Sequence, residues 1–278
     1  MSTRNPLSIS PEQLVRAYTL GIFPMAESRK DEEIVFIDPE YRALIPINKF
    51  KASKSLIRLA KKRPFKITMN KAFADVIRSC ATINRTETWI NNEIENLFIS
   101  LNNLKYAHSI ECWQNNQLIG GIYGVALGAV FFAESMFSSV SNGSKIALLN
   151  LVARLWKSGF KILDVQFLND HLIQFGAYEI NKTKFKQDLD EAIRLKTDFY
   201  YLPSTDDDFF SSDDGNDNNG NYGNDYNNND DDYDNGDNNN DDDDNDSDND
   251  DDNTFEHIAD RVSPNSIFCF KLFAINTQ

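Results

Sequence analysis

The sequence predicts an α+β fold in which a mostly antiparallel sheet with helices follows a small mixed segment. Residues 107–132 contain three successive apolar runs joined by short turns, a pattern typical of neighbouring antiparallel strands. Stretches with helical periodicity and capping residues lie on both sides of these runs. Residues 204–253 are so rich in Asp and Asn that they cannot form a packed core, and we expect them to be disordered.

Capping and turn residues define the elements of the N-terminal half. Ser10 before Pro11 is typical of a helix start, and Gly21 of the end of that helix. Asp38-Pro39-Glu40 predicts a turn between two short strands, and Asn70 is the expected N-cap of a later helix. The predicted elements are a helix at 11–20, strands at 34–37 and 43–47, a helix at 52–62, a strand at 65–69 and a helix at 71–80.

Hydrophobic periodicity defines the C-terminal half. Residues 89–104 place their apolar side chains on one side of a helix. Residues 184–195 predict an amphipathic helix with Thr183 as its N-cap, and Gly176 ends a shorter helix before it. The predicted elements are a helix at 89–104, strands at 107–113, 117–124 and 129–132, a helix at 144–158, a strand at 160–163 ending in residues 164–166, and helices at 169–175 and 184–195.

Charge is divided unevenly along the chain. The whole chain carries a net charge of −15, and residues 204–253 carry 21 Asp with no Lys or Arg, so the remainder carries +6. The acidic sequence pI of about 4.6 therefore describes the tract, and the folded part is mildly basic. Residues 254–278 form a further segment of unknown role.

Cysteine usage, hydropathy and motifs exclude several classes of protein. Cys80, Cys112 and Cys269 form no CxxC pair, and no two His residues have metal-ligand spacing, so neither a disulfide framework nor a metal site is expected. The sequence has no phosphate-binding P-loop, GxGxxG or GxSxG motif, which argues against a nucleotide cofactor and a serine nucleophile. No secretory signal is visible, and the apolar run at 118–133 is too short to span a bilayer. We expect a soluble cytoplasmic protein.

A basic run forms the clearest charged feature of the predicted folded part. Lys54, Arg58 and Lys61 have helical spacing and share one face, where like charges repel by a few tenths of a kcal/mol per pair. Nucleic-acid phosphates would offset this cost, although a solvated helix face is an equally simple interpretation. No acid interrupts the run, whose members are Lys49, Lys51, Lys54, Arg58, Lys61, Lys62, Arg63, Lys66 and Lys71.

Two carboxylates and a carboxamide lie at the predicted ends of buried strands. Glu134 follows the third apolar run, and Asp164 and Gln166 end the strand that begins at residue 160. Since Asp164 and Gln166 are two residues apart on one strand, we expect their side chains to face the same way. Strand ends are rigid and reach clefts, so they are common places for chemistry. Buried acids more often satisfy backbone amides or pair with Lys, however, so these residues alone do not define a function.

Eight segments of the chain form a recognisable set in their order and spacing. They are Gly21-Ile22-Phe23-Pro24, Asp38-Pro39-Glu40, Thr88-Trp89-Ile90, Ala107-His108-Ser109-Ile110-Glu111, residues 120–128, residues 131–138, Ser144-Lys145 and Leu163-Asp164-Val165-Gln166. With these segments, the chain resembles the leucyl/phenylalanyl-tRNA–protein transferases over about residues 8–196.

The resemblance implies a fold and an activity. It implies a small N-terminal domain at 1–48 and an aminoacyltransferase domain at 49–200 that is similar to the GNAT acetyltransferases. Such enzymes move leucine or phenylalanine from aminoacyl-tRNA to the α-amino group of proteins that begin with Lys or Arg, with methionine as a further candidate donor. The product is marked for degradation by the N-degron (N-end rule) pathway. No metal or cofactor is implied, and we expect a monomer.

The resemblance also assigns roles to individual residues. Asp164 is expected to polarise Gln166, Gln166 to contact the attacking amine or the carbonyl, and Glu134 to act electrostatically or by hydrogen bonding. For two of these residues a purely structural role is the alternative. Glu134 could cap the end of its strand, and Trp89 could anchor its helix in the core. The implied amino-acid pocket is Ile122, Phe131, Ser138 and Leu163. The implied tRNA contacts are Trp89 at the terminal adenine and Lys54, Arg58, Lys61, Lys62 and Arg63 at the acceptor stem.

Departures from the family pattern keep alternatives open. The family usually has Trp where this chain has Met25, and a Trp-rich strand at residues 35–37. Transfer of Arg to acidic N-termini is therefore an alternative specificity.

An acetyl-CoA-dependent acetyltransferase would need a pyrophosphate-binding loop that is missing after Phe131–Phe137. A non-catalytic RNA-binding protein would not need Asp164 and Gln166. The acidic tract is either an electrostatic lid over the basic surface or a tolerated extension.

Overall fold

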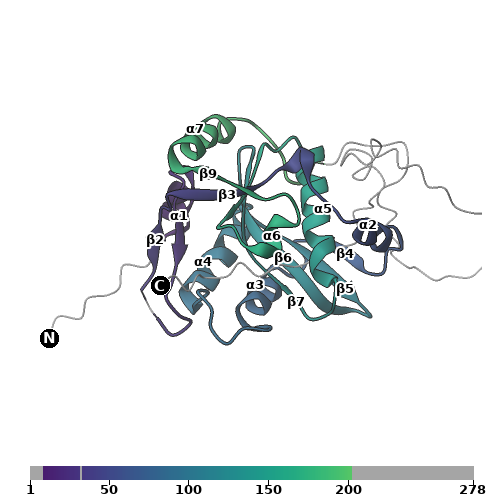
Figure 1. The fold of residues 1–278 in the computed structure, drawn as a ribbon. Coiled ribbons are helices and arrows are strands. Elements are labelled where there is room, and N and C mark those ends of the chain that lie inside the picture. Colours follow the sequence, from purple (N-terminus) through teal and green to yellow (C-terminus); the bar gives the residue numbers. More distant parts are fainter. Residues whose placement is uncertain (1–8, 32, 202–278) are drawn as a thin grey trace, which may run out of the picture.

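A seven-stranded mixed sheet forms the centre of the molecule (Figure 1). The computed structural model describes residues 9–31 and 33–201, so the predictions for residues 204–253 and 254–278 lie outside the described residues. The strand order is β4-β5-β6-β7-β8-β3-β9, and only β7 and β8 pair in parallel. This arrangement confirms the α+β class. The strands are β3 (Tyr41–Ile45), β4 (Lys66–Met69), β5 (Ala107–Gln114), β6 (Gln117–Leu127), β7 (Val130–Ser138), β8 (Ile162–Gln166) and β9 (Tyr178–Asn181).

A separate two-stranded sheet is formed by β1 (Phe23–Met25) and β2 (Val35–Ile37). The turn at residues 38–40 therefore does not join two paired strands, because β3 enters the large sheet between β8 and β9. As a result, residues before the predicted domain boundary at residue 48 contribute a strand to the central sheet. The boundary itself stays a prediction.

Helices cover both faces of the sheet. On one face, α3 (Phe73–Thr82) and α4 (Asn92–Asn103) pack through Phe73 and Phe98 against the ring of Tyr123 on β6. On the other face lies α5 (Gly143–Lys157), which is buried over most of its length. The remaining helices are α1 (Pro11–Thr19), η1 (Ile47–Lys49), α2 (Lys54–Lys61), α6 (Asp170–Ile173) and α7 (Lys182–Ile193). No helix in the described ranges is long and apolar enough to cross a membrane.

The first helix begins and ends where the sequence predicts. Ser10 and Gln13 form a capping box, in which each side chain accepts a hydrogen bond from the other residue's backbone N–H. Gly21 follows the helix with φ +78°, a left-handed conformation that favours glycine. A Cβ atom there would also lie 3.2 Å from the Phe185 ring. This turn brings the chain from α1 directly into β1.

Four predicted helix starts were wrong by two or three residues, and one of them is that of α2, which begins at Lys54 rather than at residue 52. Asn70 does not cap α3, because its side-chain oxygen accepts from the backbone N–H of Ser109 instead. The helix predicted from Trp89 begins at Asn92, where the Asn91 side chain caps the N–H of Ile94. The last helix is capped by Asn181 rather than by Thr183. The sequence analysis also missed β9, which is short and largely exposed.

Candidate active site

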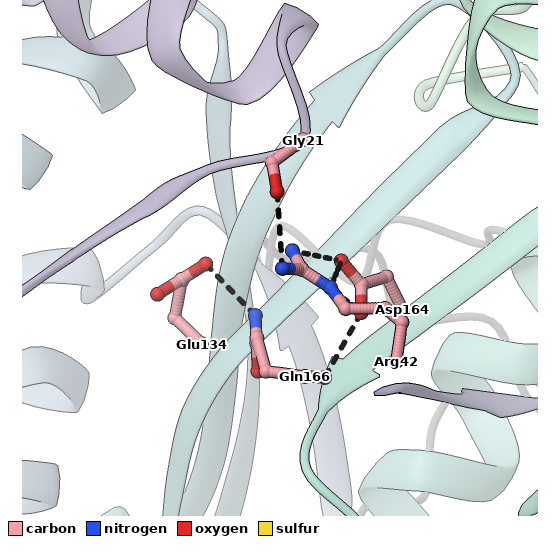
Figure 2. Close-up of polar contacts among 5 residues, drawn as sticks. All are labelled: Gly21, Arg42, Glu134, Asp164 and Gln166. Atoms are coloured by element: carbon pink, nitrogen blue, oxygen red, sulfur yellow. Dashed lines mark hydrogen bonds and ion pairs between the residues drawn. The ribbon is translucent and has the colours of Figure 1, made fainter. Parts of the chain in front are cut away.

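The candidate site lies where the two parallel strands stop pairing. The β7–β8 ladder comprises three pairs and ends at Phe132 and Asp164. Two residues further along each strand, the Gln166 Nε2 atom donates a hydrogen bond to the Glu134 Oε1 atom at 3.2 Å (Figure 2). Both side chains are buried. A bond between side chains thus joins the strands beyond the last backbone pair.

A β-bulge lies at this bond on β7 and one residue before it on β8. On β7, Glu134 is the extra residue between Ala133 and Ser135, which pair with consecutive residues of β6. On β8, Val165 is the extra residue opposite β3. A bulge interrupts the alternation of side chains and redirects them, and bulges are common beside active sites. Glu134 therefore lies within β7, not at a strand end as predicted, and the bulge gives it its direction.

Gln166 has a strained backbone that Asp164 holds in place. Its φ of +60° is in the left-handed region, which is uncommon for a residue other than glycine and costs about 1–3 kcal/mol. The backbone N–H of Gln166 donates to the Asp164 Oδ1 atom at 2.9 Å. Asp164 thus contacts Gln166 through the backbone, whereas the side-chain amide binds Glu134. Asp164 was predicted to polarise the Gln166 side chain, but the described residues show no direct contact between these two side chains.

Arg42 on β3 is the principal partner of Asp164. Its Nε and Nη2 atoms lie 2.9 and 2.7 Å from the two carboxylate oxygens, and its Nη1 atom donates to the Gly21 carbonyl at 3.1 Å (Figure 2). The side chains of Arg42 and Asp164 are 1% and 0% exposed. The guanidinium also lies between two aromatic rings, 4.6 Å from the Phe23 centroid and 4.7 Å from that of Phe185. This pair joins α1, β1, α7 and the sheet behind the site.

Burial makes the Glu134 carboxyl a weaker acid than usual. Loss of solvent raises the pKa of its carboxyl to about 8, and the negative charge of Asp164 acts in the same direction. Tyr18 and Arg42 oppose the rise in the pKa of Glu134 without cancelling it. The group therefore exchanges its proton near neutral pH, in the range where a general acid or base is most effective.

Sequence reasoning found three members of this site and missed a fourth. Glu134, Asp164 and Gln166 do come together as one hydrogen-bonded group. Arg42 was missed because the predicted strand began at the following residue. A signal was present, since a single Arg leading into an apolar strand must meet an acid if its guanidinium is buried.

The predicted amino-acid pocket lies along the α5 face of the sheet. Phe131 pairs with Leu163, and the Phe131 ring occupies the space above Gly124, two residues from Ile122. Ser138 pairs with Gly120 near the start of α5, seven residues from Phe131, or about 23 Å of strand. One amino-acid side chain cannot reach both ends of this row. Ile122 lies between the two ends of the row, two residues along β6 from the partner of Ser138 and four from the partner of Phe131, and of the four residues only Phe131 and Leu163 pair directly.

The predicted tRNA contacts fall into two places. Trp89 lies just before α4 and is only 7% exposed. The basic residues of α2 lie near the β4 edge of the sheet, on the opposite side of the molecule from α1 (Figure 1). Four strand spacings, about 19 Å, separate β4 from β8. The five predicted basic contacts, on α2 and directly after it, are all exposed, and none of them forms an ion pair with another described residue. They are Lys54, Arg58, Lys61, Lys62 and Arg63.

The fold is α+β, and its candidate site consists of buried polar groups beside two separating parallel strands. Comparison with known proteins gives the particular family. The family model for leucyl/phenylalanyl-tRNA protein transferase matches residues 44–190, and the model for its N-terminal domain matches residues 8–40. The chain belongs to this family.

Individual relatives agree with the family models. A leucyl/phenylalanyl-tRNA–protein transferase of Phenylobacterium zucineum is 48% identical over 199 residues, covering 69% of this chain and 90% of the relative. A protein of the same name from Rhodospirillum rubrum is 47% identical over 195 residues, covering 69% of this chain and 92% of the relative. Among the described residues, no group of three or more His, Cys, Asp or Glu could hold a metal ion.

Proposed function

We propose that this protein transfers leucine, phenylalanine or methionine from aminoacyl-tRNA to the N-terminal α-amino group of proteins that begin with Lys or Arg. The added residue marks the acceptor for degradation by the N-degron pathway. The observation that carries the proposal is the Glu134–Gln166 hydrogen bond at the end of the parallel ladder, within a chain of this family. We further propose that the protein acts as a monomer in the cytoplasm.

The chemistry requires positioning more than activation. An aminoacyl ester is already reactive, so holding the amine and the carbonyl in attack geometry supplies several kcal/mol of the barrier reduction. The amine nitrogen forms a bond to the carbonyl carbon, and the bond from that carbon to the ribose oxygen breaks. One proton leaves the amine and one joins the ribose oxygen. Gln166 contacts the amine, while Asp164 and Arg42 act as positioning residues that fix the backbone of Gln166.

The donor side chain is proposed to enter between β7 and β8 beyond their last pair. This route leads from Gln166 toward Phe131, Leu163 and Ile122 on the α5 face. An apolar site of this kind distinguishes side chains by shape, at about 1–3 kcal/mol for each methylene gained or lost. Ser138 remains a predicted pocket residue. Because it is distant from Phe131 along β7, it would line only the far end of the pocket.

The tRNA is proposed to lie from α2 toward the site. The exposed basic residues of α2 would meet acceptor-stem phosphates, reading the shape of the RNA more than its sequence. Trp89 would stack on the terminal adenine through the small part of its ring that is exposed. The two contacts would place the 3′ end of the tRNA over the separation of β7 and β8.

A transfer assay tests the proposal. Purified full-length protein is incubated with tRNA charged with radiolabelled Leu, Phe, Met or Arg, and with peptides beginning with Lys, Arg, Asp or Glu. Label is expected to move from Leu-, Phe- or Met-tRNA to the Lys and Arg peptides. Transfer of Arg to acidic peptides would preserve the reaction and overturn the specificity. Binding of tRNA without any transfer would support the non-catalytic alternative.

A further inference from the structure

Two buried tyrosine hydroxyls near the site have no hydrogen-bond partner among the described residues. Tyr18 on α1 and Tyr123 on β6 are both 0% exposed, and both hydroxyls are unpaired. Leaving a buried polar group unsatisfied costs about 1–3 kcal/mol, and such groups are rare enough to require an explanation. A Phe at either position would fill the same core without this cost. The hydroxyls are therefore candidates for contact with a ligand.

Both hydroxyls approach Glu134. The Tyr18 ring lies 4.9 Å from the ring of Phe132, the residue that pairs with Asp164. Tyr123 pairs with Ser135, the next residue after Glu134. The carboxyl of Glu134 is close enough to each tyrosine to raise the pKa of both hydroxyls further, after burial itself. The Tyr18 hydroxyl and Glu134 interact, but not in a geometry that completes a hydrogen bond.

We propose that Tyr18, Tyr123 and Glu134 form the receiving site for the α-amino group of the acceptor protein. This inference rests on the proposed function and names a ligand contact within it. An ammonium group has three N–H donors and no acceptor. The site provides three oxygens from three different elements: two phenolic oxygens and the Glu134 carboxylate. An anion at the same position would face the Glu134 carboxyl, while the nearby Arg42 and Arg85 already bind Asp164 and Ser135.

The three oxygens also suit the change that the amine undergoes before attack. In the fraction of molecules in which Glu134 is ionised, the ammonium passes one proton to the Glu134 carboxylate, and the neutral amine keeps two N–H bonds for the phenolic oxygens. Its lone pair is then free to attack the ester carbonyl. The pKa of Glu134, about 8, is close to that of a peptide α-amino group, about 7.7–8.0, so the proton can move in either direction.

Charged and titratable groups on the surrounding elements influence this proton transfer between the amine and Glu134. The Arg85 guanidinium lies near Tyr123, and its Nη2 atom donates to the Ser135 hydroxyl at 2.8 Å rather than to the tyrosine. Arg42 is similarly bound to Asp164. The groups that face Glu134 and the two tyrosines are Arg42, Asp164, Cys80, Arg85 and Glu95.

Replacing each tyrosine by phenylalanine removes only the hydroxyl. Calorimetry with the full chain compares a peptide beginning with Arg and the same peptide with an acetylated N-terminus. Wild-type protein is expected to prefer the free amine, and Tyr18→Phe and Tyr123→Phe are each expected to reduce this preference about three- to tenfold, the effect of one hydrogen bond. Both variants are expected to unfold at the wild-type temperature or above it, because an unpaired buried hydroxyl is lost. Tyr106→Phe, at a residue that is 40% exposed, is the matched control.

Steady-state transfer with the same variants separates the amine site from other roles. The KM for the Arg peptide is expected to rise about three- to tenfold while the KM for aminoacyl-tRNA stays constant. An unchanged preference for the free amine in both variants, or a rise in the KM for aminoacyl-tRNA alone, would overturn the inference. If wild-type protein transferred nothing but both variants lost the preference, the proposed function would fail and the amine site would stand.

Discussion

Arg42 binds both carboxylate oxygens of Asp164 in the interior, although 122 residues separate the two in sequence. The pair fixes Asp164, Asp164 fixes the backbone of Gln166, and the Gln166 side chain binds Glu134. The reactive part of the site therefore depends on a residue that contacts none of the proposed substrates. This dependence leads to the first prediction.

Arg42→Ala is expected to destabilise the fold strongly. It leaves the Asp164 carboxylate buried without its partner, which typically costs about 3–5 kcal/mol. Denaturant unfolding followed by circular dichroism measures the loss. Arg194→Ala, which removes an exposed ion pair with Asp190 on α7, is the control and should leave the unfolding midpoint unchanged. Equal midpoints for both variants would show that the buried pair contributes nothing.

Glu134→Gln is expected to change how stability depends on pH. The pKa of Glu134 is raised from 4.5 to about 8 in the folded protein, so the folded state retains a proton that the unfolded state has lost between these values. Wild-type stability should therefore fall as pH rises from about 5 to 8, by at most about 1.4 kcal/mol per pH unit. Unfolding midpoints measured across this range should decline less in the variant. Parallel curves for the two proteins would contradict the raised pKa.

Gln166→Ala is expected to lower transfer more than about tenfold, which corresponds to roughly 1.4 kcal/mol of barrier. The variant loses the amide that meets the substrate, so tRNA affinity should stay constant while the rate falls. Gln166→Gly is a useful companion, because it also lacks the amide but tolerates φ +60°. It should be equally inactive and more stable than the Ala variant. Full activity in both variants would support the non-catalytic RNA-binding alternative.

Replacing Lys54, Arg58 and Lys61 by Ala is expected to weaken tRNA binding without affecting the fold. The three side chains are exposed on one face of α2, and each phosphate contact that is lost should flatten the dependence of log affinity on log salt. Three lost contacts predict a slope smaller by about two to three, measured by filter binding at several salt concentrations. Arg194→Ala on α7 should leave the slope unchanged. A uniform loss of affinity with the original slope would indicate that α2 does not meet phosphates.

Local signals in the sequence predicted most of the fold, and the site only in part. Helix α1 and strands β4 to β6 could be placed because caps, turns and alternation are properties of neighbouring residues. The two bulges could not, because a bulge exists only relative to the strand opposite. Arg42 and the two tyrosines depend on contacts between distant segments in the same way. The family resemblance identified Glu134, Asp164 and Gln166 without revealing how they are joined.

The acidic tract at residues 204–253 lies outside the described residues, the last of which is Tyr201. The Asn70 side chain, which directly follows β4, donates to the Tyr200 hydroxyl at 3.0 Å, and the tract begins three residues after Tyr201. The last described residues therefore lie close to the strand that follows the basic residues of α2. Deleting residues 204–253 is expected to leave the unfolding temperature unchanged and to strengthen tRNA binding at low salt, because 21 negative charges no longer compete with phosphates.

Two further measurements distinguish the electrostatic lid from a tolerated extension. Replacing every Asp of the tract by Asn keeps its length and removes its charge, so it should strengthen tRNA binding as much as the deletion does. Raising the salt to about 1 M shortens the screening length to about 3 Å and should abolish the difference between these variants and the wild type. If the affinities at low ionic strength are the same with and without the tract, the extension has no electrostatic effect on the basic surface.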